Sequence, residues 1–476
     1  MKMSRRLPLI VACALFIENM DSTVLATALP VIAGDFRVDP ISLKLVLTTY
    51  LLALAVFIPI SGWVADRFGA RITFISAIAV FLLGSIGCAA SGSLETMVVA
   101  RFVQGMGGAM MVPVGRLVLL RTVSKSELVQ ALSWLTIPAL VGPVAGPPLG
   151  GLITTYFNWR WIFLINLPMG LLGMLLAWRF IPPLKEPTKP LDWIGFLLSG
   201  IGLALTMFGV STFGRLRIPL WASCLALLLG LVLLAAYVIH ARRVPNPLLD
   251  LRLFRIPTFR AGVVGGSLFR IGIGAIPFLL PLMLQLGFGL TPLQSGMLTF
   301  ISAVGAMFMK TIAAWIIRQW GFRRVLLFNA VLASVSLAIF GLFRPSTPHA
   351  VVMLVLLVSG CMRSLQFTSL NAISYADVDQ VQVSQASSLA AMMQQLSVSM
   401  GVAVAGFALE LCGWARHVPA TDLGNFYLVF PMVATISLLS SVMMWRLPAD
   451  AGAEMAGKAQ AGHEVAEPKV EQRPAM

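Results

Sequence analysis

Two carboxylates, Glu18 and Asp21, stand three residues apart in an otherwise apolar stretch near the N-terminus. This spacing places both side chains on one face of a helix. Two neighbouring carboxylates in a low-dielectric cavity resist ionising together, so one of them can keep a proton near neutral pH and exchange it. The pattern predicts a proton-carrying site. The alternative is that both acids are structural partners of buried arginines.

Arg101 lies in a later apolar stretch and is expected to face the first helix. As a mobile partner it would tune the proton affinity of Asp21 by approaching or leaving the carboxylate. As a permanent partner it would form a packing ion pair, because a buried charge needs a counter-charge. Both interpretations predict that removal of Arg101 is damaging.

The apolar stretches contain a surplus of positive charge, since five cations stand against two deep acids. An unpaired charge in a membrane interior costs at least about 2.5–3.5 kcal/mol, so the surplus needs a counter-ion or a water-filled cavity. Some of these side chains are expected to line a cavity that binds an anionic substrate, such as a carboxylate or a metal chelate. The expected cavity residues are Arg116, Arg270, Lys310, Arg363 and Gln104. The alternative is that the basic side chains snorkel to the membrane surface, Arg116 most of all.

No pattern in the chain indicates enzymatic chemistry. All four histidines, His240, His349, His417 and His463, lie in predicted loops, at helix ends or in the tail. The five cysteines fall within apolar stretches without metal-ligand spacing and are expected to be packing residues. We therefore expect no catalytic residue, no metal and no cofactor. A sensor is disfavoured because no further soluble domain is predicted to pass on a signal.

The elements that position these residues are membrane-spanning helices. The chain of 476 residues is 58% hydrophobic and 11% charged, whereas a soluble domain carries roughly 25% charged residues. Backbone groups in lipid must be paired within helices or closed barrels, and apolar runs of about 20 residues without alternation favour helices. Fourteen spans are predicted, near 7–30, 41–65, 72–91, 95–120, 128–154, 161–181, 191–213, 218–240, 259–286, 293–317, 324–343, 349–372, 386–412 and 425–447.

The net charge of +15 comes from basic clusters between the apolar runs and does not indicate a nucleic-acid partner. An even number of spans puts both termini on one side. Of the 34 Lys and Arg residues, 22 lie on the side of the termini and seven in the opposite loops. Loops rich in Lys and Arg face the cytoplasm, so both termini are predicted to be cytoplasmic. The pair Arg215 and Arg217 fits this orientation least well.

One loop pattern occurs twice. The stretch 62–71 recurs in degraded form at 314–323, with Trp63, Gly69 and Arg71 matched by Trp315, Gly321 and Arg323. Both copies join two helices on the side of the termini. Repeated halves are a common plan of transporters, with the substrate site between them near the middle of the membrane.

These motifs resemble the major facilitator superfamily over nearly the whole chain. Residues 62–71 fit its G-x-x-A-D-R-x-G-x-R loop signature, 101–108 its fourth-helix motif and 142–151 its fifth-helix antiporter motif. The runs 159–168, 20–23 and 28–30 resemble the fourteen-helix drug:proton antiporter branch typified by EmrB and QacA. Within that branch, 107–117 is most similar to the MdtD-like bacterial proteins.

The resemblance implies an all-α fold with fourteen transmembrane helices, arranged as two six-helix bundles plus a two-helix insertion. The expected domains are 1–182 (N-terminal bundle), 183–245 (linker insertion), 246–447 (C-terminal bundle) and 448–476 (disordered cytoplasmic tail). The resemblance makes Asp21 a better candidate for the proton carrier than Glu18. It also assigns conformational roles to two motifs, Gly62, Asp66, Arg67, Gly69 and Arg71, and Gly142, Pro143, Gly146 and Gly150. The second motif would seal the cavity against proton leak, or would simply form a kinked packing helix.

The resulting functional hypothesis is a proton-coupled efflux transporter of the multidrug-resistance type that works by alternating access. The alternative is an exporter of an organic anion. The expected partners are a small-molecule substrate, protons and membrane lipid, with no nucleic acid and a monomeric state. The expected location is a bacterial inner membrane.

Overall fold

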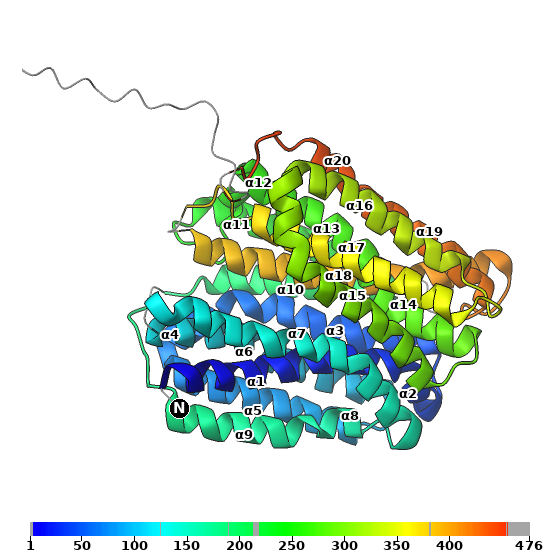
Figure 1. Cartoon of the computed structure of the whole chain (residues 1–476). Coiled ribbons are helices and arrows are strands. Elements are labelled where there is room, and N and C mark those ends of the chain that lie inside the picture. The colour runs from blue at the N-terminus through cyan, green and yellow to red at the C-terminus, as the bar shows by residue number, and fades with distance from the viewer. Residues whose placement is uncertain are drawn as a thin grey trace, which may run out of the picture.

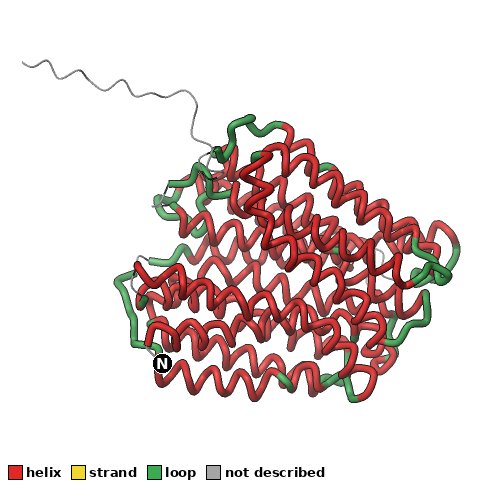
Figure 2. Tube along the Cα trace, viewed as in Figure 1, coloured by secondary structure: helices red, strands yellow, loops and turns green. Residues whose placement is uncertain are grey.

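The computed structural model describes residues 3–123, 125–188, 190–212, 219–379, 382–453 and 455, without the side chains of 3–6 and 125–140. This part of the chain consists of helices and connecting loops (Figure 2). Arg215, Arg217 and most of the predicted tail 448–476 lie outside it. The all-α prediction is confirmed.

The N-terminal bundle lies in the lower half of Figure 1. Its elements are α1 (Met3–Val24), η1 (Leu25–Thr27), α2 (Leu29–Phe36), η2 (Pro40–Leu43), α3 (Lys44–Phe57), η3 (Ile58–Ile60), α4 (Ser61–Phe68), α5 (Ala70–Ala90), α6 (Leu94–Thr122), α7 (Lys125–Tyr156), α8 (Trp161–Leu164) and α9 (Asn166–Phe180).

A helical pair, α10 (Trp193–Thr212) and α11 (Leu220–Arg243), follows. The C-terminal bundle lies in the upper half of Figure 1. Its elements are η4 (Leu251–Arg255), α12 (Pro257–Arg260), η5 (Ala261–Gly265), α13 (Gly266–Gly274), α14 (Ile276–Leu282), η6 (Met283–Gly287), α15 (Pro292–Trp320), α16 (Phe322–Ile339), η7 (Phe340–Leu342), α17 (His349–Ile373), α18 (Val383–Arg416), α19 (Leu423–Leu438) and α20 (Ser440–Trp445).

Thirteen helical segments in the described residues are long and apolar enough to cross a membrane. The helix α7, of 32 residues, occupies the place of the remaining predicted span. The first predicted span, 7–30, is longer than the observed segment Leu7–Thr27. The α-helix ends at Val24, and a 3-10 turn leads into α2. Large apolar side chains such as Trp178, Leu228 and Phe308 are exposed on the outside of the molecule, as lipid contact requires.

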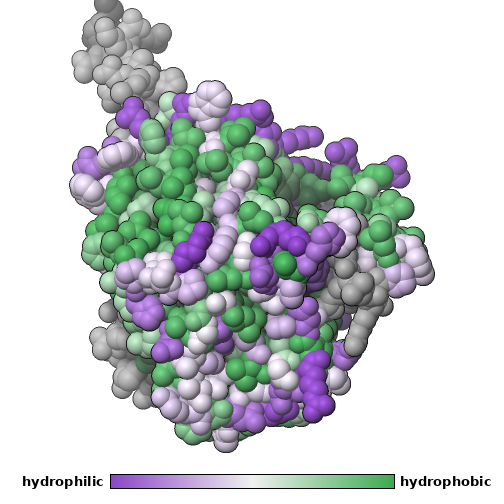
Figure 3. Space-filling model, turned by 90° about the vertical axis from the view of Figure 1, so that its right-hand side faces the viewer, coloured by the Kyte–Doolittle hydropathy of each residue, from purple (hydrophilic) through white to green (hydrophobic). Residues whose placement is uncertain are grey.

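All long helices run between two faces of the molecule. We call the face where α1 begins and α20 ends the termini face; it lies at the left of Figure 1. Figure 3 views the opposite face, where hydrophilic side chains are scattered among hydrophobic ones. This opposite face carries the loops that join α1 to α3 and α18 to α19.

The two bundles repeat one packing pattern. In the N-terminal bundle α1 packs on α7, and both α3 and α5 pack on α6. In the C-terminal bundle α13 packs on α18, and both α15 and α16 pack on α17. Between the bundles α3 meets α18 and α7 meets α15, contacts that exchange under a two-fold rotation. The linker helix α10 packs beside the α3–α18 contact.

The repeated loop motif has the same structure in both bundles. Gly69 and Gly321 both have positive φ, of 94° and 78°, which only glycine adopts without strain. Two residues later, Arg71 donates to the Trp178 carbonyl at 3.1 Å and Arg323 to the Trp445 carbonyl at 3.0 Å. Each arginine thus ties the start of the third helix of its bundle to the end of the last one.

Close contacts join the bundles on the side of the opposite face. Gln285 donates to the Thr27 carbonyl at 2.9 Å, and the Leu293 amide donates to Thr155 Oγ1 at 3.1 Å. Gly151 and Gly296 let α7 and α15 touch, since a Cβ at either position would overlap the backbone of the other helix. Small residues promote such close helix contact in membranes.

An ion pair also joins the two bundles near the opposite face. Lys44 Nζ at the start of α3 lies 3.0 Å from Glu410 Oε1 near the end of α18. The Lys44 side chain is fully buried, and Gly406 leaves room for its stem. The pairing of residues 366 positions apart has no local sequence signal.

Replacement of Glu410 by Gln removes the carboxylate partner of a buried ammonium group, a change that costs about 3–5 kcal/mol in buried pairs. We expect Glu410→Gln to favour separation of α3 and α18 at the opposite face. Spin labels are placed on Gly34→Cys and Trp414→Cys, both exposed on that face. Double electron–electron resonance spectroscopy should show longer distances between the labels in Glu410→Gln than in the parent protein.

The double variant Lys44→Glu/Glu410→Lys should restore the shorter distances. Asp422→Asn, which breaks the exposed Arg416–Asp422 pair within the C-terminal bundle, is the matched control and should leave them unchanged. Equal distances in Glu410→Gln and the parent protein would show that the pair does not hold the bundles together.

Candidate functional site

The Asp21 carboxylate is the centre of a sealed polar network in the N-terminal bundle. Its Oδ2 accepts from Arg101 Nη1 at 2.6 Å. Its Oδ1 accepts from Gln104 Nε2 and Asn166 Nδ2, each at 2.9 Å. Gln104 Nε2 also donates to Ser85 Oγ at 2.8 Å, so α1, α5, α6 and α9 meet at this point. The exposed fraction of Asp21 is 1%, and that of Arg101 is zero.

Arg101 is held by further contacts that fix its position. Its Nε donates to the Val46 carbonyl at 3.4 Å, and its guanidinium carbon lies 4.3 Å from the centre of the Tyr50 ring. Phe163 covers it at 5.8 Å. Arg101 therefore joins α6 to α1 and α3 in this structure.

Glycines on α6 make this approach of helices geometrically possible. A Cβ at Gly105 would overlap the Tyr50 carbonyl of α3, and one at Gly107 would overlap the backbone of α5 at Ala77 and Phe81. The helix itself starts with a capping box between Ser93 and Thr96. Without side chains at these glycines, α6 lies close enough for Arg101 and Gln104 to reach α1.

Glu18 lies outside this network, one turn before Asp21 on α1. It is 8% exposed, and it takes part in no ion pair of the described residues. Its side chain and the Tyr50 hydroxyl both lie against Gly108. The Tyr50 hydroxyl is buried without a hydrogen-bond partner in the described structure. The two acids thus occupy different environments although they share a helix.

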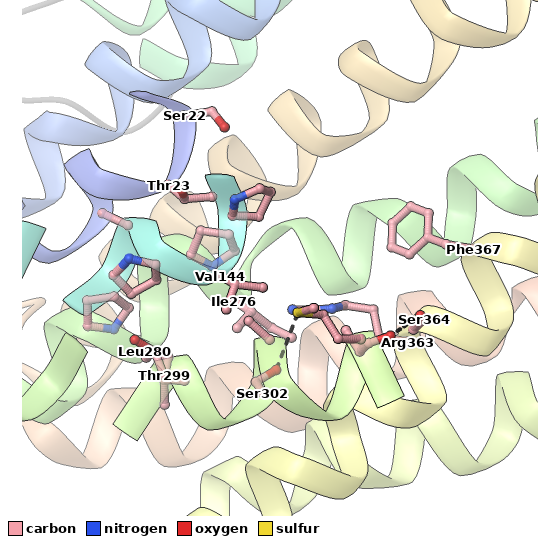
Figure 4. Close-up of a pocket in the computed structure, with 18 of the residues that line it drawn as sticks. Ser22, Thr23, Val144, Ile276, Leu280, Thr299, Ser302, Arg363, Ser364 and Phe367 are labelled. Carbon is pink, nitrogen blue, oxygen red and sulfur yellow. Dashed lines mark hydrogen bonds between the residues drawn. The ribbon is translucent and has the colours of Figure 1, made fainter. Parts of the chain in front are cut away.

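A cavity of about 490 Å³ lies between the bundles (Figure 4). From the N-terminal bundle it is lined by residues of α1, η1 and α7, including Ser22, Thr23 and Val144. From the C-terminal bundle it is lined by residues of α14, α15, α17 and α18, including Ile276 and Phe367. Ser22 and Thr23 directly follow Asp21, so α1 connects the sealed network to the cavity wall.

Two of the predicted cavity cations line it. Lys310 projects from α15 and Arg363 from α17. Arg363 Nη2 donates to Ser302 Oγ at 3.3 Å, as Figure 4 shows. None of the described lining residues is acidic. Arg270 lies behind this wall, 4% exposed, with its guanidinium carbon 5.4 Å from the centre of the Phe367 ring.

Three predicted cavity residues lie elsewhere. Gln104 does not line the cavity because it is fully buried in the Asp21 network. Arg270 is covered by Phe367 and donates to Asn371 Oδ1 at 3.2 Å. Arg116 is exposed on the termini-side half of α6, which agrees with the snorkelling alternative.

The predicted conformational motifs occupy helix contacts. Asp66 pairs with Arg121 of α6 at 2.8 Å, and Arg121 Nε pairs with Glu186 at 3.2 Å. Gly69 makes the turn described above, whereas Gly62 and Arg67 are exposed at the helix end. On α7, side chains at Gly142, Gly146 and Gly150 would collide with α1, and Pro143 faces the cavity.

Asn166 and Ser85 are site residues that the sequence interpretation missed. Asn166 lies in the run 159–168, which resembles the antiporter branch. A polar side chain within a predicted apolar span could have marked it as a site residue. Asp192, at the start of α10, accepts from His240 of α11 at 2.7 Å. Burial raises the pKa of Asp192, but hydrogen bonds from Gly195 N, His240 and Leu248 N outweigh it and leave that pKa below its usual value. No group of three or more metal-ligating side chains occurs in the described residues.

Comparison with known proteins gives consistent matches. A family model described as Major Facilitator Superfamily matches residues 11–402 and 262–471. A multidrug resistance protein MdtD of Pectobacterium carotovorum subsp. carotovorum (strain PC1) is 37% identical over 93% of this chain and 95% of its own. MdtD of Salmonella heidelberg (strain SL476) is 36% identical over 93% and 94%. The crystal structure of an auto-inhibited POT family peptide transporter covers 99% of both chains, with a TM-score of 0.69 and 14% identity.

Replacement of Arg101 by Met would leave the buried Asp21 carboxylate without its counter-charge, at a cost of about 3–5 kcal/mol. We expect a corresponding loss in the free energy of unfolding in detergent, measured by denaturant titration. The double variant Asp21→Asn/Arg101→Met should lose less than the sum of the single variants, because each single change strands the other group.

Asp35→Asn is the matched control. It breaks the partly exposed Asp35–Arg160 pair, with side-chain exposures of 46% and 33%, and should have little effect on unfolding. Strict additivity of the two single changes would contradict the direct coupling of Asp21 and Arg101.

Proposed function

The chain belongs to the Major Facilitator Superfamily, and on this premise we propose that it is a proton-coupled exporter that moves small molecules out of the cytoplasm by alternating access. The family and the relatives identify a membrane transporter of multidrug type rather than an enzyme. It handles small molecules and is a multi-pass protein of a bacterial inner membrane. Proton coupling, direction of transport and a monomeric state within the lipid are the proposed parts.

The observation that carries the proposal is the continuity of α1 from its two acids to the cavity. Glu18 and Asp21 are followed by Ser22 and Thr23, which form part of the cavity wall. A protonation change at Asp21 alters the ionic contact with Arg101 that fixes α1 to α6. Asp21 holds three donors from two other helices, so loss of its charge would free α1 to move relative to α6 and α9.

We propose that Glu18 and Asp21 share this task. Glu18 has no ion-pair partner in the described residues and retains some exposure, which suits exchange of a proton. The ion pair of Asp21 and Arg101 then responds to the charge on Glu18. Each carboxylate raises the free energy of charging the other, because they are one helical turn apart.

The closed side of the molecule is the one away from the termini. The contacts of Gly151 with α15 and of Gln285 with Thr27 close the bundles near the opposite face. On α15 the cavity begins one turn further in, at Thr299, and extends to Lys310 towards the termini face. With cytoplasmic termini, as the distribution of basic residues predicts, this is the state that loads a solute from the cytoplasm.

The helix contacts between the bundles supply the moving interface. The contacts α3–α18 and α7–α15 are equivalent under the two-fold relation of the bundles. Rotation of one bundle against the other would open these contacts and close the termini face. The hydrogen bonds of Arg71 and Arg323 would hold the third helix of each bundle during that rotation.

The test is uptake of ethidium and of a carboxylate anion into inside-out vesicles with an imposed pH gradient. The parent protein should accumulate solute only while the gradient lasts. Asp21→Asn and Glu18→Gln should each lower gradient-driven uptake by about tenfold or more, the effect expected when a positioned proton-transfer group is lost.

Glu95→Gln, at an exposed carboxylate of the same bundle, is the control and should transport normally. Equilibrium exchange without a gradient should survive in the two acid variants, which separates loss of coupling from loss of folding. Undiminished gradient-driven uptake by both acid variants would refute the proposed coupling sites.

A further inference from the structure

We propose that the cavity selects an amphiphilic organic anion, whose anionic group binds Arg363 and Lys310 and whose apolar body lies against Ile276 and Phe367. This inference names the solute class of the transporter and so rests on the proposed function. It follows from the charge and shape of the cavity wall alone.

The charge on the cavity wall is positive. Arg363 and Lys310 are the charged residues among the described lining side chains, and both are basic. Neither takes part in any ion pair of the described residues, whereas Arg101 and Lys44 each bind a carboxylate. Arg363 is tied only to the neutral Ser302 hydroxyl among the hydrogen bonds seen here. These cations therefore lack the counter-charge that the chain supplies to Arg101 and Lys44.

A further cation, Arg270, lies behind the same wall. Arg270 is 4% exposed, and its Nε is buried without a hydrogen-bond partner in the described structure. It packs on Phe367, which faces the cavity one helical turn after Arg363. Its field adds positive potential to the C-terminal side of the cavity. An entering cation would meet repulsion there, and an entering anion would meet attraction.

The remainder of the cavity wall is mainly apolar. Most of the other lining residues are aliphatic, aromatic or proline, and Figure 4 shows Ile276, Leu280 and Val144 among them. Hydroxyls of Ser302, Thr299 and Ser364 provide a few polar points. A cavity of about 490 Å³ lies within the range of about 300–1,000 Å³ of pockets for drug-sized ligands. A small, multiply charged anion would leave this apolar surface uncovered, whereas a single anionic group on a ring system fits both parts.

The guanidinium of Arg363 provides the specific recognition. Its planar fork matches a carboxylate with two parallel hydrogen bonds, while Lys310 acts as a point charge. Arg363 is therefore expected to determine affinity more strongly than Lys310. A neutral analogue of the same shape would leave both cations without a counter-charge.

Three probes with one ring system separate charge from shape: naphthylacetate, naphthylacetamide and naphthylethylammonium. Binding of radiolabelled naphthylacetate to the purified full-length protein is measured by scintillation proximity, and the other two probes serve as competitors. The anion should bind about tenfold or more tightly than the amide or the amine, as expected for a charge-assisted pair.

Arg363→Gln should weaken naphthylacetate binding by about tenfold, and Arg363→Lys should restore part of it. Lys310→Gln should have a smaller effect. Arg318→Gln, on the same helix as Lys310 but outside the cavity, is the matched control and should bind like the parent protein. Unchanged thermal unfolding of each variant verifies that the fold is intact.

Equal affinity for the three probes, no binding of naphthylacetate, or undiminished binding by Arg363→Gln would each overturn the inference. Failure of the proposed function has a different signature. If the anion binds through Arg363 but no solute accumulates under a pH gradient, proton-coupled export fails and the assigned cavity stands. If ethidium accumulates under the gradient but the anion is not preferred, proton-coupled export stands and the anion selectivity of the cavity fails.

Discussion

The cost of holding a charge away from water organises this molecule. In the N-terminal bundle the charge of Arg101 is neutralised by Asp21 and enclosed by helices from all sides. In the C-terminal bundle Arg363 and Lys310 have no carboxylate partner in the described residues and face a cavity instead. A charged group at membrane depth requires either a partner or access to water or ligand. The two bundles meet that requirement in the two different ways, although they share one packing pattern.

Under the proposed function, this asymmetry gives the two halves separate tasks. The paired half can respond to a proton, because loss of the Asp21 charge breaks contacts to two other helices. The unpaired half can respond to a solute, because an anion supplies the charge that the chain omits. The α1 residues Ser22 and Thr23 form part of the same cavity wall, so the two responses meet in one place. Movement of α1 against α7, along its glycine contacts, is the physical route by which they would be coupled.

Much of this could be predicted from local sequence properties. The spans follow from hydropathy, and the loop repeat follows from matched residues at a fixed offset. A charge within a span is costly and marks a residue as a candidate, so Lys310 and Arg363 could be singled out in advance, together with Arg116 and Arg270. Which neighbour a side chain faces could not be predicted, because it depends on how helices pack. Gln104 thus turned out to serve Asp21 rather than the cavity, and the partner of Lys44 lies 366 residues away.

The central claim is that the cavity contains water at membrane depth while the Asp21 network is dry. Reaction of single cysteines with a membrane-impermeant maleimide in broken membranes tests it directly, because only a thiolate in water reacts. Met307 lines the cavity and is 40% exposed, its neighbour Phe308 is 61% exposed but lies outside the cavity, and native Cys88 is buried beside Gln104. In a background without other cysteines, Met307→Cys should react, whereas Phe308→Cys and Cys88 should not. Equal reactivity at Met307→Cys and Phe308→Cys, or rapid reaction of Cys88, would contradict the account.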